Sequence, residues 1–240
     1  MSEELSRNIS AERCLIVNAD DFGQTLGITQ GIIECHQRGI VTSTSLMVTG
    51  CALDQAVALA AENPRLSIGL HFDVWGEDER DWDTSDISAT RDEFYRQLER
   101  FLRVMKRPPT HVDSHRHVHR EEQLFPHFCE WVRPLGVPLR GDGKVNFIGG
   151  FYAQWEWQMT QLEYVSVPFL SRMIHEEVPY GYTEISCHPG RITSDYRGVY
   201  SREREVEIAT LTDLRICEHI RREGVKLMNY ADYVGEQACR

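Results

Sequence analysis

The chain has 240 residues, of which 41% are hydrophobic, a size and composition that suit one folded domain spanning residues 1–240. Its formal net charge of −11, without any basic cluster, argues against a nucleic-acid-binding protein. No apolar run is long enough to span a membrane, and the polar N-terminal stretch does not resemble a signal peptide. Seven cysteines without a CxxC pair indicate reduced thiols, so we expect a cytoplasmic protein.

Short apolar strands alternate with helical patterns along the whole chain. In chain order we expect a strand at 13–18, a helix at 27–37, a strand at 42–47, a helix at 53–61, a strand at 67–72, a helix at 91–105, a strand at 110–114, a helix at 123–132, a strand at 137–140, a helix at 168–177, a strand at 183–187, a long helix at 201–222 and a strand at 225–228. The clearest helix is 91–105, where apolar residues recur about every 3.6 residues.

This alternation predicts an α/β fold with a parallel sheet. About seven strands, one for each repeating unit, favour a TIM-barrel-like (β/α) barrel that is closed or nearly closed, and a doubly wound open sheet is the alternative. In either architecture the active residues belong at the carboxyl ends of the strands.

The first strand ends in the stretch NADDFG, where Asp20 and Asp21 are adjacent. Two neighbouring carboxylates repel each other, and at least one of them has an unfavourable pKa unless a cation lies between them. A divalent metal ion is one such cation. Either aspartate alone could equally be an ordinary turn or helix-cap residue, so other ligands must be sought at the remaining strand ends.

Ionisable residues do end several other strands. His71 ends the third strand, Arg140 the fifth and His188 the sixth. Any one of them could be a hydrogen-bonded core or loop residue. Together, however, they place ionisable residues at more strand ends than chance would give. An aspartate and two histidines from three strands form a common ligand set for a catalytic divalent metal with open positions.

The fourth strand runs into the segment THVDSHRHVH. His111, Asp113 and His115 occupy alternate positions, so in an extended chain they point the same way, towards the barrel axis. His117 and His119 are expected to extend beyond the strand as a surface stretch, and we do not assign them to the metal.

Five segments together resemble a known family: NADDFG, VTSTSLMV, IGLHF, THVDSHRHVH and SCHPG. Their order and spacing resemble the motifs of the YdjC-like carbohydrate deacetylases, the family of chitooligosaccharide deacetylase, over nearly the whole chain. The resemblance implies a TIM-barrel-like fold and a metal-dependent hydrolase that removes the acetyl group from an N-acetylated amino sugar.

The same resemblance assigns roles to five residues. It implies that Asp21, His71 and His115 bind the metal, that Asp20 is the catalytic base, and that His188 faces Asp20 across the site. The expected cofactor is one divalent ion, with zinc as first choice and magnesium, cobalt or nickel as alternatives.

Three further residues have candidate roles around this set. Arg140 would hold Asp20 in position or bind substrate, although an ordinary salt bridge is an equal alternative. Asp113 would orient a metal-binding histidine, and His111 would do the same or simply pack.

The segments that follow the strands should form the substrate walls. Tyr152, Trp155 and Trp157 offer flat rings on which a sugar could stack, or they form a buried plug. The acidic segment 77–86 is expected to be a solvated loop. The expected partner is a small carbohydrate or glycoconjugate, a homo-oligomer is possible, and the alternatives are hydrolysis of another amide or ester and an inactive sugar-binding or metal-binding homologue.

Overall fold

The computed structural model describes residues 12–77, 81–156 and 158–239. Its strands form one parallel sheet in the order β4-β3-β2-β1-β6-β5, and β7 pairs with the beginning of β1. Their bounds are β1 Arg13–Phe22, β2 Ser43–Leu46, β3 Ser67–Phe72, β4 Val112–Ser114, β5 Asn146–Ile148, β6 Gly181–Cys187 and β7 Val225–Leu227.

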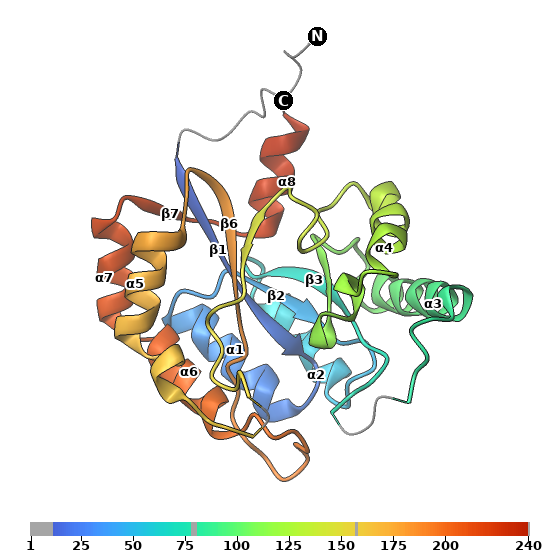
Figure 1. The fold of residues 1–240 in the computed structure, drawn as a ribbon, viewed down its shortest axis with the longest axis horizontal. Coiled ribbons are helices and arrows are strands. Elements are labelled where there is room, and N and C mark those ends of the chain that lie inside the picture. Colours follow the sequence, from blue (N-terminus) through green and yellow to red (C-terminus); the bar gives the residue numbers. More distant parts are fainter. Residues whose placement is uncertain (1–11, 78–80, 157, 240) are drawn as a thin grey trace.

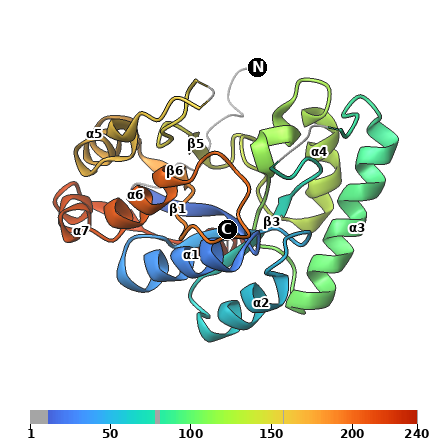
Figure 2. The same cartoon turned by 90° about the horizontal axis from the view of Figure 1, so that it is seen from below.

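Helices α1 to α7 pack around the outside of this curved sheet (Figure 1, Figure 2), whereas Tyr230 and Tyr233 of α8 pack against Cys14, Ile16 and Tyr182 in a separate core cluster. Helices α5, α6 and α7 lie on one side, α1 and α2 lie below, and α3 and α4 lie on the other side (Figure 2). Their bounds are α1 Leu26–Arg38, α2 Leu53–Glu62, α3 Ile87–Met105, α4 Phe125–Val132, α5 Val167–Glu177, α6 Arg202–Leu211, α7 Leu214–Arg222 and α8 Tyr230–Ala238.

β1 is the central strand of the sheet. β1 pairs with β6 along one edge and with β7 and then β2 along the other. Every residue after Arg13 is buried, because alternate side chains of the strand enter two core clusters, one on each face of the sheet. Burial on both faces explains why this strand is a continuous apolar run until its carboxyl end. The expected parallel α/β fold is therefore confirmed.

The sheet is an open half-barrel, so the expectation of a closed or nearly closed barrel is not met. β4 and β5 each end the path of paired strands. The expected strand at 137–140 is a single bridge from Leu139 to Val112, and β5 forms further along the chain. Two features limit this pairing: Pro138 has no N–H with which to extend the ladder in one direction, and the N–H of Asp142 turns back to the carbonyl of Leu139 in the other.

The carboxyl-terminal third differs from expectation in two further places. The expected helix at 201–222 is two helices, because the Asp213 side chain accepts the N–H of Arg215 and begins α7 anew. Helix α8, which was not predicted, begins with a capping box formed by Asn229 and Asp232.

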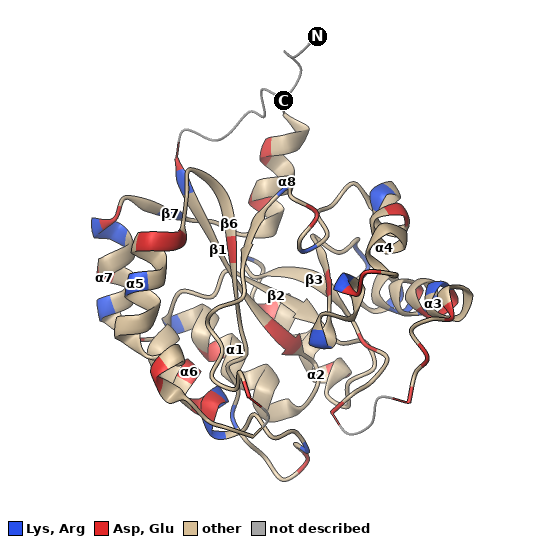
Figure 3. Ribbon diagram, viewed as in Figure 1, with Lys and Arg blue, Asp and Glu red and all other residues tan. Residues whose placement is uncertain are grey.

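Basic and acidic side chains are interspersed on the outer helices, as α3 and α6 illustrate (Figure 3). Among the described residues, no helix combines the length and the apolar composition that crossing a membrane requires.

Candidate active site

A bulge at the end of β1 places both adjacent aspartates in one cavity. Ala19 pairs with Thr44 and Phe22 with Leu46, so three steps along β1 match two along β2, and Asp21 has a positive φ of 70°. In a regular strand two successive side chains point to opposite faces, whereas a bulge redirects one of them. Asp20 and Asp21 therefore both line one cavity. Figure 3 shows the acidic end of β1.

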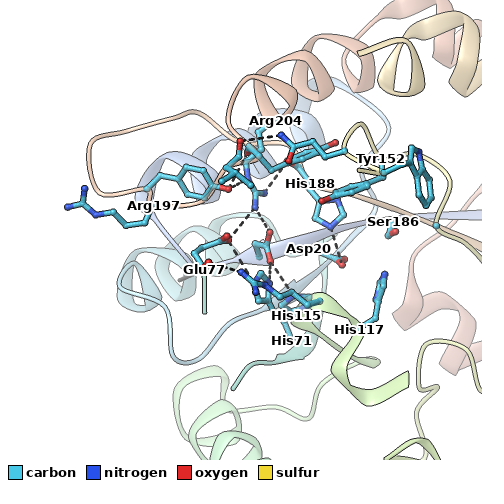
Figure 4. A pocket seen from close by; sticks show the side chains of 18 residues that line it. Asp20, His71, Glu77, His115, His117, Tyr152, Ser186, His188, Arg197 and Arg204 are labelled. Carbon is cyan, nitrogen blue, oxygen red and sulfur yellow. Dashed lines mark hydrogen bonds and ion pairs between the residues drawn. The ribbon is translucent and has the colours of Figure 1, made fainter. Parts of the chain in front are cut away.

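This cavity has a volume of about 590 Å³ and lies at the carboxyl ends of the strands (Figure 4). Asp20 and Asp21 come from β1, His71 from β3, His115 from the turn after β4, and His188 from the loop after β6. The structure thus brings together all five residues that the family resemblance singled out.

Asp21, His71 and His115 form one side of the cavity. Asp21 Oδ1 lies 3.2 Å from His71 Nε2 and 3.1 Å from His115 Nδ1, and both side chains are buried. Ligand atoms around a tetrahedral zinc ion are about 3.3 Å apart, given metal–ligand bonds of about 2.0–2.1 Å. The observed separations fit a divalent metal bound between these three atoms.

The hydrogen bonds on the far sides of the two imidazoles support this fit. Asp113 Oδ1 lies 2.7 Å from His71 Nδ1, so that nitrogen carries the proton and leaves the lone pair of Nε2 free. The carbonyl of Gly76 lies 3.1 Å from His115 Nε2 and likewise leaves the lone pair of Nδ1 free. Two lone pairs then face the Asp21 carboxylate, an arrangement that needs a cation between them.

The electrostatics of this cluster also call for a positive charge. Burial alone would lower the pKa of His71, but the carboxylates of Asp113 and Asp21 outweigh burial and raise that pKa well above its usual value. Burial also tends to lower the pKa of His115, but the Asp21 carboxylate outweighs burial and raises that pKa. A positive charge between the two imidazoles and Asp21 is therefore favoured. His71 Nε2 is buried and, among the described residues, faces the Asp21 carboxylate at 3.2 Å without a well-aligned hydrogen bond.

Asp20 lies close to His71 and is paired with Arg140. The two carboxylate oxygens of Asp20 each accept from the guanidinium at 2.7 Å, and Arg140 also contacts Asp113 at 2.8 Å and Glu184 at 2.5 Å. Burial tends to raise the pKa of Asp20, but Arg140 outweighs burial and holds that pKa below its usual value. Asp20 is therefore an ionised carboxylate beside Asp21, His71 and His115.

His188 lies on the other side of Asp20, with Nε2 at 3.8 Å from Asp20 Oδ2. Burial lowers the pKa of His188 to about 4, so the imidazole is neutral at neutral pH. Its backbone is held by helix α6: the N–H donates to Glu207 at 2.5 Å and the carbonyl accepts from Arg204 at 3.1 Å.

Of the remaining residues that the sequence predicted, some contact the residues of the cavity and others pack in the core. Asp113 contacts His71, whereas His111 packs: its ring stacks on Tyr230 with centroids 3.9 Å apart and lies against Gly69. The expectation that His119 lies in a surface stretch is wrong, because its side chain is buried against Ser114 and the carbonyl of Arg140.

The aromatic segment after β5 contributes to the cavity wall. Tyr152 and Trp155 line the cavity, and Trp155 is 57% exposed. Tyr152 also stacks on Tyr200 with centroids 4.7 Å apart. Trp157 lies outside the described residues.

Sequence reasoning missed several residues of this site. Arg204 donates to Asp21 Oδ2 at 2.6 Å, although it lies in a charged helix that reads as solvent-exposed. Glu77 belongs to the acidic segment expected to be solvated, yet it lines the cavity and accepts from Gln24 at 2.6 Å. Arg204 lies with Glu203 and Glu207 on one face of α6, but charged residues also occupy its other faces, so the helix sequence alone does not single out this face.

Comparison with known proteins gives matches over most of the chain. A family model described as YdjC-like protein matches residues 14–222. The chain is 31% identical over 253 residues to a chitooligosaccharide deacetylase of Salmonella typhi, and the alignment covers 89% of this chain and 98% of that protein.

Two solved structures illustrate the structural likeness. An Enterococcus faecalis V583 protein, described as a candidate cellobiose-phosphate cleavage protein, matches with a TM-score of 0.78 and 26% identity over 93% of this chain and 99% of that one. The Bc1960 peptidoglycan N-acetylglucosamine deacetylase matches with a TM-score of 0.58 over 91% of this chain and 86% of that one, and at 12% identity this shows a shared fold alone. Because the family model matches well over half of its residues, the chain belongs to the YdjC-like protein family.

Proposed function

We propose that this protein is a metal-dependent hydrolase that removes the N-acetyl group from an N-acetylated amino sugar and releases acetate. The observation that supports this most directly is the cluster of Asp21, His71 and His115, whose ligand atoms lie within 4.8 Å of one another, with Asp20 beside it. The relative described as a chitooligosaccharide deacetylase supports an N-acetylglucosamine-containing oligosaccharide or glycoconjugate as substrate.

Asp21, His71 and His115 would hold one divalent ion. Zinc is our first choice, because two imidazoles and one carboxylate suit it better than they suit magnesium, while cobalt and nickel are alternatives. When bound, the ion would lower the pKa of a water from about 15.7 to about 7 and polarise the acetyl carbonyl.

The residues on the other side of the site would move the protons. Asp20 accepts a proton from the attacking water, and Arg140 keeps this carboxylate ionised. A neutral His188 must first gain the proton that it donates to the departing nitrogen. Asp20, 3.8 Å away, is the residue placed to supply it.

The sugar would bind against the aromatic wall of the cavity. Tyr152 and Trp155 present ring surface to the cavity beside His188, whose ring lies 5.6 Å from that of Tyr152. Flat aromatic surface suits the apolar face of a sugar ring. Trp157 follows in the same segment and remains a candidate.

The test is acetate release from N-acetylglucosamine and its short oligomers. The protein is first stripped with a chelator and then supplied with zinc, magnesium, cobalt or nickel. We expect acetate release that depends on added metal and is lost in Asp20→Asn. Release of phosphate from sugar phosphates without any acetate release, or no activity with any metal, would contradict the proposal.

A further inference from the structure

His117 lines the cavity, yet neither the metal cluster nor the proposed proton transfers use it. It follows the metal-binding residue His115 by two positions, in the turn of residues His115–Arg120. Arg116 and His117 have positive φ values of 51° and 53°, a left-handed conformation that is costly for residues with a side chain. Asparagine, aspartate and histidine tolerate it best.

This turn separates two histidines that an extended strand would present on the same side. His115 contacts Asp21 at 3.1 Å, whereas His117 lies on the Asp20 side of the cavity, near Ser186 (Figure 4). The left-handed turn thus presents a second imidazole to a different part of the cavity.

The ring of His117 is supported but has an unused polar atom. It packs edge-to-face on Phe147, with centroids 5.5 Å apart and an interplanar angle of 77°. Its Nδ1 is buried and makes no hydrogen bond to any described residue. Buried polar side-chain atoms in native proteins nearly always have a partner, and because this ring lines the cavity, that partner is an ordered water or a bound ligand.

We propose that His117 is a substrate-binding residue that hydrogen-bonds a hydroxyl group of the sugar ring bearing the acetamido group. This rests on the proposed deacetylase function. The acetyl group must lie beside Asp21 and Asp20 to react, and His117 lies on the opposite side of Asp20 from the metal cluster (Figure 4). The part of the substrate within its reach is therefore the ring to which the acetamido group is attached.

The proposal is tested with His117→Phe, which keeps a ring against Phe147 but removes the nitrogens. The substrates are N-acetylglucosamine oligomers in which the reacting sugar has either all its hydroxyls or one replaced by hydrogen. We expect His117→Phe to lower kcat/KM for the full substrate about tenfold. Removing one particular hydroxyl from the substrate should lower kcat/KM of the wild type by a similar factor. The same deoxy analogue should not lower kcat/KM of the variant any further.

Two more variants complete the comparison. His117→Asn, which tolerates the left-handed backbone and keeps a hydrogen-bonding group, should recover part of the loss. His175→Phe, at an exposed histidine of α5, should behave as wild type.

Three outcomes would overturn the role of His117 while leaving the deacetylase function intact. The first is unchanged kinetics in His117→Phe, and the second is that each deoxy analogue lowers kcat/KM by the same factor in variant and wild type. The third is loss of bound metal in the variant. A wild type that releases no acetate from the full substrate would instead contradict the deacetylase function itself.

Discussion

The side-chain carboxyl group of Glu207 accepts a hydrogen bond from the backbone N–H of His188 at 2.5 Å. The hydroxyl of Tyr200 lies 2.6 Å from the other oxygen of this carboxyl group and accepts from the N–H of Ala153. One buried side chain of α6 therefore connects the His188 loop to the aromatic segment that forms the cavity wall.

Replacing Glu207 by glutamine should change how stability depends on pH. Burial raises the pKa of Glu207 to about 8 from an ordinary 4.5, so the folded state keeps a proton that the unfolded state loses. Between those two values the folded protein binds more protons, and its stability falls as pH rises. Glu207→Gln has no carboxyl group at this position, so its stability does not fall in this way. The Tm of the variant minus the Tm of the wild type should therefore increase from pH 5 to pH 8.

Thermal unfolding at intervals across this range measures the effect. Glu205→Gln, at an exposed position on the same helix, serves as the control and should follow the wild-type pH curve. Parallel curves for Glu207→Gln and wild type would show that this carboxyl is not protonated in the folded protein.

Asp20→Asn should keep the metal and lose turnover. The amide cannot accept the proton of the attacking water, and general base catalysis is typically worth about 10²–10⁴-fold. Bound metal by elemental analysis and kcat by acetate release together test this, with Asp54→Asn at an exposed position of α2 as control. A near-normal kcat would assign the base to another residue.

The meeting of Asp21, His71 and His115 was predictable because parallel strands bring their carboxyl ends to one edge of the sheet, and these residues lie at or just after the ends of β1, β3 and β4. Their assignment to a metal came from the family resemblance and stays a prediction. The bulge at Asp20 and Asp21 was not predictable, because it arises from the register between β1 and β2, two segments distant in sequence.

Helix α6 shows a different limit of prediction from the sequence, namely a buried polar face. Its sequence, REREVEIATL, has charged residues on every face, a composition typical of a solvated helix. Glu203, Arg204 and Glu207 are nevertheless buried, because each has partners supplied by other loops: Gln154 for Glu203 and the His188 backbone for the other two. Such a buried polar face depends on tertiary partners that the helix sequence does not contain.

His71→Ala and His115→Ala should each lose the metal, since each removes one of three protein ligands. Asp113→Asn should weaken metal binding more mildly, by about 10–100-fold, because it disturbs the hydrogen bond that directs His71 Nε2 towards the ion. Competition with a chelator of known affinity measures all three, and His175→Ala is the control. Unchanged metal affinity in His71→Ala would place the ion elsewhere.

Arg204→Ala should destabilise the fold and disturb the metal site together. The guanidinium is buried, donates to Asp21 Oδ2 at 2.6 Å and also holds the carbonyl of His188. Removing one partner of a buried ion pair typically costs about 3–5 kcal/mol, because the other charge is left uncompensated.

Here that charge is on Asp21, and an ion bound at the cluster can compensate it in part. Denaturant unfolding should therefore show a larger loss of stability in chelator than with zinc, whereas Arg202→Ala, at an exposed position of α6, should show neither loss. Equal losses with and without zinc would mean that Arg204 supports the fold independently of the metal site.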